Sequence, residues 1–334
     1  MPLLDVSDLR IELPTRQGPA LAVRGVDFAL ERGATLGLIG ESGCGKSLTA
    51  QALMGLLPEG ARVSGSIRFD GQEIVGLADR ALQRLRGNRM AMVFQEPMTA
   101  LNPVHTIGHQ VAEPLRLHRG LGARAARQEA IALLDRVGIP DAARRFDAYP
   151  HQFSGGQRQR ITIAMALACG PDLLIADEPT TALDATVQRQ ILQLIQELVA
   201  ERGMALILIS HDLGVIAQNA ARMLVMYGGS VAENGPTAEV FSAMAHPYTR
   251  GLFAARPQLN RPLAPGERLP TIAGTVPELW ALPTGCTFAG RCPWTAPTCH
   301  TTVPAPLPVG GSAQHTVRCL RPEAIAAQPT ATPP

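Results

Sequence analysis

The sequence has no long hydrophobic run. Apolar residues make up 46% of the 334 positions, yet no stretch of them approaches the ~20 consecutive residues that a membrane-spanning helix needs. The first residues also lack the basic segment and the apolar core of a signal peptide. We therefore expect a cytoplasmic chain, whose contact with any membrane is made through a partner protein.

The sequence also lacks an excess of charge of one sign. Its 30 Lys and Arg residues nearly balance 28 Asp and Glu residues, for a net charge of +2, whereas a nucleic-acid footprint needs basic residues concentrated on one face. We therefore expect no nucleic-acid partner. The length, with only 17% charged residues, suits a globular chain with a large core and more than one structural unit.

The six cysteines lack the tight C-x₂-C pairs of common zinc modules. Four of them cluster near the C-terminus: Cys286, Cys292, Cys299 and Cys319. In a reducing cytoplasm such a group is more often a metal or cluster site than a disulfide framework. The spacing alone leaves three arrangements open, which are an iron–sulfur cluster, a zinc site, and free or disulfide-linked cysteines.

What the sequence does contain is a phosphate-binding loop. Residues 40–47 read GESGCGKS and fit the pattern G-x-x-x-x-G-K-[ST] at every fixed position. An apolar run at 35–39 predicts a buried strand before the loop, and residues 47–54 predict a helix after it. We expect this loop to bind nucleotide phosphates and, through Ser47, Mg²⁺. The residues expected at the nucleotide are Gly40, Ser42, Gly43, Cys44, Gly45, Lys46, Ser47 and Leu48.

A second motif supplies two carboxylates at the end of another strand. Four apolar residues at 173–176 precede Asp177 and Glu178, which is a Walker B arrangement. Asp177 is suited to holding Mg²⁺ through water, and Glu178 to polarising the water that attacks the γ-phosphate. The apolar run at 205–209 and the amphipathic helix predicted for 185–200 complete a βαβ unit, which indicates a parallel sheet.

A third motif, FSGGQ at residues 153–157, precedes a predicted helix. Ser154 can cap that helix, and the glycines expose backbone N–H groups at its positive end. A second phosphate-binding end in one chain suggests a composite site.

These residues carry a family resemblance. The sequence resembles the ATPase subunit of an ATP-binding cassette transporter over roughly residues 1–250, and its signature differs from the usual LSGGQ only at Phe153. The resemblance implies an α/β P-loop NTPase fold with a parallel sheet, an antiparallel β-subdomain and an α-helical subdomain at about 96–168. It also implies that Ser154, Gly155, Gly156 and Gln157 contact the ATP held by a partner ATPase.

Three further residues match motifs of the same family. Gln95 matches the Q-loop glutamine, which senses Mg²⁺ and the attacking water. Asp184, in residues 182–184, matches the D-loop that crosses the dimer interface, and His211 matches the switch histidine at the γ-phosphate. One departure concerns the base: no aromatic residue precedes Phe28, so the aromatic that usually stacks on adenine cannot be assigned.

Three local features resemble the D-type ATPases of bacterial dipeptide and oligopeptide importers. They are the sequences QEPMTALNP at 95–103, YPHQ at 149–152 and HPYT at 246–249. The resemblance implies a heterodimer with a related F-type ATPase, two membrane permease subunits and a periplasmic or surface binding protein. The expected place is the cytoplasmic face of the inner membrane. The cargo stays open between peptides, glutathione and nickel, and a soluble cassette ATPase outside transport is a remote alternative.

Residues 251–334 are expected to form a C-terminal extension with little regular structure, because prolines become frequent, as at Pro257, Pro262, Pro265 and Pro270. Members of the peptide-importer branch carry a similar cysteine set as ligands of a [4Fe–4S] cluster, and four thiolates can fill such a cluster. The resemblance therefore favours a [4Fe–4S] cluster on the four C-terminal cysteines. The expected cofactors are ATP, Mg²⁺ and this cluster.

Overall fold

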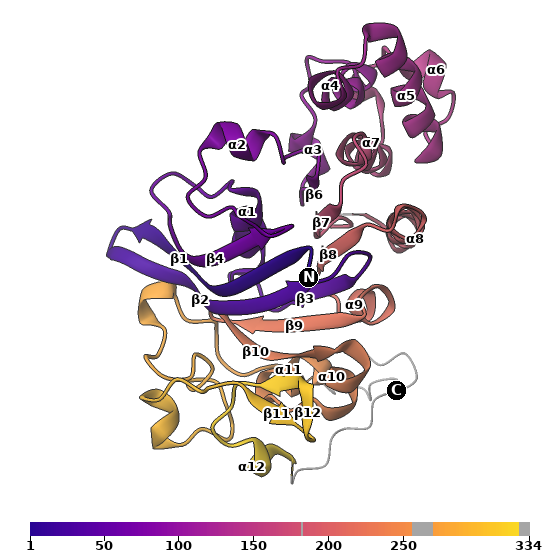
Figure 1. The fold of residues 1–334 in the computed structure, drawn as a ribbon. Coiled ribbons are helices and arrows are strands. Elements are labelled where there is room, and N and C mark those ends of the chain that lie inside the picture. The colour runs from indigo at the N-terminus through magenta and orange to yellow at the C-terminus, as the bar shows by residue number, and fades with distance from the viewer. Residues whose placement is uncertain (182, 256–269, 327–334) are drawn as a thin grey trace.

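The computed structural model describes residues 1–181, 183–255 and 270–326 of the chain (Figure 1). Ala182 of the expected D-loop and the prolines at 257, 262 and 265 lie outside the described residues. In the described part, no helix is long and apolar enough to cross a membrane.

A parallel sheet forms the centre of the molecule, as the apolar runs predict. The strands β9, β3, β8, β7 and β6 lie side by side in that order, and each pair is parallel. Their bounds are β3 (Thr35–Ile39), β6 (Met90–Val93), β7 (Leu173–Asp177), β8 (Ala205–Ile209) and β9 (Arg222–Tyr227). Every residue of β7 and β8 is buried, which explains why these strands appear in the sequence as uninterrupted apolar runs.

Two hydrophobic clusters cover opposite faces of this sheet. Successive side chains of a strand point to opposite faces, so Leu174 and Ala176 pack with the helices, whereas Leu173 and Ile175 pack with the antiparallel sheet. That second sheet has the order β2–β1–β4–β5, with bounds β1 (Leu4–Thr15), β2 (Gly18–Leu30), β4 (Arg62–Phe69) and β5 (Gln72–Glu73). Phe28, which lies on β2, is buried in this cluster.

Helices between β6 and β7 form a separate group at the upper right of Figure 1. Their bounds are α3 (Pro97–Ala100), α4 (Ile107–Arg119), α5 (Ala123–Arg136), α6 (Ala142–Arg145), η1 (Pro150–Gln152) and α7 (Gly155–Leu167). The helices α1 (Lys46–Met54), α2 (Asp79–Gln83), α8 (Ala185–Arg202), α9 (Leu213–Asn219), α10 (Thr237–Ala243) and α11 (Pro247–Ala254) accompany the two sheets. The amphipathic helix predicted for 185–200 is α8.

The C-terminal extension is more regular than its prolines predict. It contains η2 (Leu279–Ala281), η3 (Pro297–His300), β11 (Leu307–Val309), β12 (Ser312–Val317) and α12 (Pro322–Ala326). The strand β12 pairs antiparallel with β10 (Ser230–Pro236), which itself pairs with β9, so the extension forms the edge of the central sheet. In Figure 1 the extension, in orange and yellow, lies beneath β9 and β10.

A buried carboxylate fixes this edge. The Glu233 side chain on β10 is fully buried, and it accepts hydrogen bonds from the backbone N–H groups of Ala245 and His246, each at 2.9 Å. His315 Nε2 on β12 lies 2.8 Å from the same carboxylate. Because an unpaired buried carboxylate is costly, these contacts tie β12 and the start of α11 to β10.

Candidate functional site

The phosphate loop connects β3 to α1, in the order that the motif requires. Gly40 is essential to its shape, because a Cβ atom there would lie 2.1 Å from the Met226 carbonyl oxygen and 2.7 Å from Cys44 Sγ. Ser42 and Gly43 are exposed at the outside of the turn, whereas Cys44 is buried. Burial raises the pKa of the Cys44 thiol, so Cys44 contributes an apolar packing side chain to the loop.

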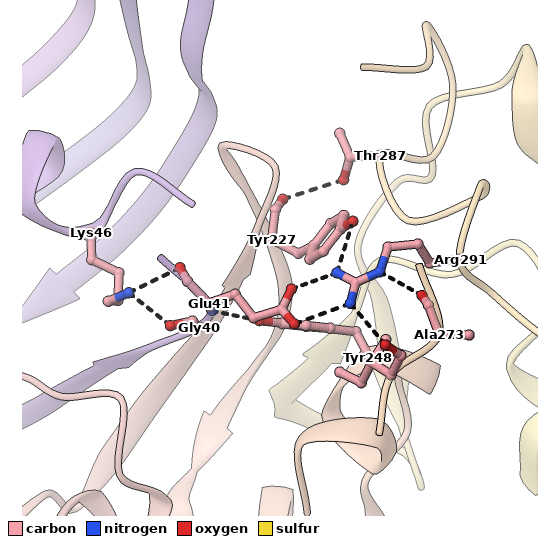
Figure 2. A network of polar contacts seen from close by, with 9 residues as sticks. Gly40, Glu41, Lys46, Tyr227, Tyr248, Ala273, Thr287 and Arg291 are labelled. Carbon is pink, nitrogen blue, oxygen red and sulfur yellow. Dashed lines mark hydrogen bonds and ion pairs between the residues drawn. The ribbon is translucent and has the colours of Figure 1, made fainter. Parts of the chain in front are cut away.

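Lys46 lies back across its own loop. Its Nζ donates hydrogen bonds to the Gly40 carbonyl oxygen at 2.7 Å and to the Glu41 carbonyl oxygen at 3.1 Å, as Figure 2 shows. The side chain is buried at the first position of α1. The ammonium group is therefore held over the concave side of a loop whose backbone can bind phosphate.

The magnesium-binding residues predicted at two distant places in the sequence meet. Ser47 Oγ donates a hydrogen bond to Asp177 Oδ1 at 3.2 Å, which joins the start of α1 to the end of β7. Asp177 is buried, and burial raises the pKa of its carboxyl group, an effect opposed by the Ser47 hydroxyl and Lys46. A hydroxyl and a carboxylate side by side are oxygen ligands of the kind that Mg²⁺ prefers. Gln95, the third expected magnesium residue, contacts Glu178 instead.

Three motifs converge on one oxygen of Glu178. Its Oε2 accepts hydrogen bonds from Gln95 Nε2 at 3.2 Å and from Thr181 Oγ1 at 3.0 Å, and it lies 3.2 Å from His211 Nδ1. These residues come from the ends of β6, β7 and β8. The cluster can orient a water molecule and hold a proton near the end of a bound triphosphate.

The Glu178 backbone is strained. Its φ of 45° lies in the left-handed region, which costs a non-glycine residue about 1–2 kcal/mol. The Glu178 N–H donates to the Ile209 carbonyl oxygen at 3.0 Å, and this bond to β8 helps to hold the conformation. Such strain at a polar cluster is typical of functional sites.

Sequence reasoning missed Thr181. The residue follows Glu178 by one turn, and a threonine in a turn is too common to attract notice. Its hydrogen bond nevertheless helps to fix the Glu178 carboxylate.

The signature motif is an N-terminal helix cap. Ser154 Oγ accepts a hydrogen bond from the Gln157 N–H at 3.3 Å, and Gln157 Oε1 accepts one from the Ser154 N–H at 3.1 Å, which is a capping box. Gly155 and Gly156 form the first turn of α7. A Cβ atom at Gly156 would lie 2.8 Å from Val187 Cγ1, so this glycine allows α7 and α8 to approach closely.

Asp184 is likewise a helix cap. Its Oδ1 accepts hydrogen bonds from the N–H groups of Thr186 and Val187, each at 3.0 Å, at the start of α8. Among the described residues, no hydrogen bond joins Asp184 or Ser154 to residues 40–47. The chain therefore brings together its phosphate loop, Asp177 and the Glu178 cluster. Ser154 and Gly155 of the signature are exposed and lie apart from the phosphate loop.

The expectation of a [4Fe–4S] cluster is wrong. Within residues 1–181, 183–255 and 270–326, no group of three or more His, Cys, Asp or Glu side chains is arranged to hold a metal ion. The same finding argues against a zinc site on these cysteines. All four C-terminal cysteines are free thiols and form no disulfides.

The C-terminal cysteines contribute to the packing of the extension. They border a cavity of about 20 Å³, together with apolar side chains that include Phe288, Trp294 and Ile325. That space is large enough for about one water molecule. Burial raises the pKa of Cys286 and Cys319, and it raises that of Cys292 to about 11. These three thiols therefore remain protonated at neutral pH, and they pack as small apolar side chains.

Two models of known protein families match separate parts of the chain. The family model described as "ABC transporter" matches residues 23–181. The model described as "Oligopeptide/dipeptide transporter, C-terminal region" matches residues 232–299. The two matches include the phosphate loop, the signature and the start of the extension.

Curated relatives match nearly the whole chain. A "Putative peptide import ATP-binding protein" of Brucella melitensis biotype 1 is 50% identical over 336 residues, which cover 98% of this chain and 99% of the relative. A protein of the same description from Brucella abortus strain 2308 is 51% identical over 313 residues, or 93% of each chain.

Solved structures match the cassette. The ATP-binding cassette MJ0796, in a dimeric post-hydrolysis state bound to ADP and Pi, is similar with a TM-score of 0.63 and 27% identity, over 70% of this chain and 98% of that chain. The protein cbiO1 from Clostridium perfringens is similar with a TM-score of 0.61 and 28% identity, over 73% of this chain and 92% of that one. The α/β P-loop fold is thus confirmed, and the chain belongs to the ABC transporter family as an ATPase that carries the oligopeptide/dipeptide transporter C-terminal region.

Proposed function

We propose that this ATPase powers the import of dipeptides or oligopeptides through a membrane transporter. The observation that carries the proposal is the match over 98% of the chain to relatives described as peptide import ATP-binding proteins. The match of residues 232–299 to a peptide-transporter region supports it independently.

In this proposal the chain's own ATP is bound and hydrolysed at the ends of the central strands. Lys46 binds the β- and γ-phosphates, Ser47 and Asp177 hold Mg²⁺, and Glu178 polarises the attacking water. Gln95 and His211, both in contact with Glu178, report the state of the γ-phosphate. Figure 2 includes the start of this phosphate loop.

The proposed assembly is asymmetric. Residues 1–250 form the ATPase domain, with a helical subdomain at about 96–168, and residues 251–334 form the extension. The exposed signature of this domain closes on ATP held by a related F-type subunit, and Asp184 lies at that interface. Closure around two nucleotides moves two permease subunits, which receive cargo from a binding protein. The ATPase lies on the cytoplasmic face of the inner membrane.

A transport assay tests the cargo. The chain, its partner ATPase, the two permeases and the binding protein are reconstituted in vesicles, with MgATP on the ATPase side. We expect labelled di- or oligopeptide to accumulate, and no accumulation with a non-hydrolysable ATP analogue. Accumulation of glutathione or nickel without peptide would refute the proposed cargo.

Gly155→Asp tests the composite site. Gly155 is exposed in the first turn of α7, and a Cβ atom there meets only Leu183 at 3.8 Å, so the aspartate fits and even favours the helix N-terminus. Two like charges about 4 Å apart repel by about 4 kcal/mol at an effective dielectric constant of about 20. We therefore expect azido-ATP labelling to fall at least about tenfold on the partner ATPase and to persist on this chain.

Gly155→Asn is the matched control, because it adds the same shape without the charge. It should have a much smaller effect on labelling of the partner. If Gly155→Asp removes nucleotide from this chain alone, the composite site is refuted.

A further inference from the structure

An arginine of the C-terminal extension is held against the phosphate loop. Arg291 Nη1 donates to Glu41 Oε2 at 2.5 Å, and Nη2 donates to Glu41 Oε1 at 3.2 Å, so the pair is bidentate (Figure 2). Glu41 is the second residue of the loop, 250 positions from Arg291 in the sequence. The exposed fractions of the two side chains are 6% for Arg291 and 28% for Glu41.

All five N–H donors of Arg291 are used. Besides the two bonds to Glu41, Nε donates to the Ala273 carbonyl oxygen at 2.9 Å, Nη2 to the Ile272 carbonyl oxygen at 3.2 Å and Nη1 to Tyr227 Oη at 3.4 Å. The hydrogen bonds to Glu41 raise the pKa of Arg291 above its ordinary value. A guanidinium with every donor satisfied is fixed in both position and direction.

Glu41 is fixed at its backbone as well. Its N–H donates to Tyr248 Oη at 2.7 Å, and its carbonyl oxygen accepts the bond from Lys46 Nζ. Tyr248 and Tyr227 are buried and pack with Phe288 of the extension, with ring centroids 4.7–5.4 Å apart. Glu41, which accepts a hydrogen bond from Lys46, is therefore also held in place by α11, β9 and the extension.

The ion pair between Arg291 and Glu41 affects the charge of the phosphate loop, and therefore nucleotide binding. The loop receives a polyanion, and a carboxylate within it repels phosphate unless a cation neutralises it. Arg291 is the cation that pairs with Glu41 among the described residues. We propose that Arg291 is a positioning residue for the phosphate loop, which neutralises Glu41 and thereby makes ATP binding depend on the C-terminal extension.

ATP kinetics of the full chain in its assembled transporter test the proposal. Arg291→Ala should raise the KM for ATP by about tenfold or more and change kcat by less than about threefold, because it leaves an uncompensated, mostly buried carboxylate in the loop. Arg291→Lys, which keeps the charge but loses the planar fork, should give an intermediate KM.

The double variant Glu41→Gln/Arg291→Ala separates charge from structure. Removing the carboxylate should return the KM to within about threefold of the wild-type value. A merely structural arginine gives no such rescue, since the extension would remain damaged. Arg321→Ala is the matched control: Arg321 also lies in the extension and donates to the Trp294 carbonyl oxygen, and its removal should leave the KM unchanged.

Two results would overturn the proposal. One is an unchanged KM in Arg291→Ala, and the other is a double variant that binds ATP no better than Arg291→Ala. If Arg291→Ala does not fold, the proposal is overturned by an unchanged KM in Arg291→Lys, or by a double variant whose KM stays more than about threefold above the wild-type value. Every readout concerns ATP and none concerns cargo, so the outcome is independent of the proposed peptide import.

Discussion

Glu178→Gln should retain MgATP while the hydrolysis rate of the assembled transporter falls by at least about a hundredfold, as expected for loss of a general base. The amide preserves shape and can still contact Gln95 and Thr181, so the cluster should keep its geometry. It cannot take a proton from the attacking water. We therefore expect the measured kcat to fall and the measured MgATP affinity to stay unchanged.

Glu201→Gln is the matched control for that measurement. Glu201 lies on the exposed side of α8, where it pairs with Arg136, and exposed pairs of this kind contribute little. Its replacement should leave both kcat and affinity unchanged. Near-wild-type turnover in Glu178→Gln would contradict the role proposed for Glu178.

Gly40→Ala should strongly weaken nucleotide binding. The added Cβ atom would lie 2.1 Å from the Met226 carbonyl oxygen, a backbone atom of β9 that cannot rotate away. The start of the loop must then move, and with it the Gly40 and Glu41 carbonyl oxygens that hold Lys46. Equilibrium binding of MgATP to the purified chain measures the effect. We expect the affinity to fall by about ten- to a hundredfold, because overpacking penalties are about 1–3 kcal/mol and about 1.4 kcal/mol is a tenfold change in affinity.

Gly18→Ala provides the comparison. Gly18 also has a positive φ, of 108°, but no atom lies within 4 Å of its added Cβ, and it is the first residue of β2, directly after the turn that follows β1. This variant carries backbone strain without a collision, so it should lower the melting temperature by a few degrees and keep ATP affinity. Normal ATP binding by Gly40→Ala would show that the loop does not need the geometry described.

Three of the five parallel strands could be predicted, because burial on both faces leaves a clear apolar pattern. Residues 35–39, 173–176 and 205–209 are uninterrupted apolar runs, and each became a strand of the parallel sheet. The strand β12 gave no such signal, since four of its six residues are polar. It forms because β10 offers an open edge and because Glu233 needs a buried partner such as His315, 82 residues away.

The candidate site was predictable residue by residue, but its connections were not. Motif matching identified Gln95, Glu178 and His211 separately, whereas their meeting at one carboxylate oxygen depends on strand order. The contact between Arg291 and Glu41 joins segments 250 residues apart and leaves no local pattern. The [4Fe–4S] cluster was wrongly predicted for a related reason. Cysteine spacing shows that thiols are near one another in the sequence, but it does not show whether they are arranged to bind a metal ion.

The pairing of β12 with β10 has a consequence for the integrity of the ATPase. A sheet edge with free N–H and C=O groups is a template for pairing with another chain. By pairing with Glu233 and Asn234, the extension covers the edge of β10 and leaves the three-residue strand β11 as the outermost strand at this end of the eight-stranded sheet. Very short edge strands are poor templates for pairing with another chain. Loss of β12 by proteolysis would expose the edge of β10 and would remove His315 from the Glu233 carboxylate. We therefore expect a chain without β12 to aggregate more readily than the full chain.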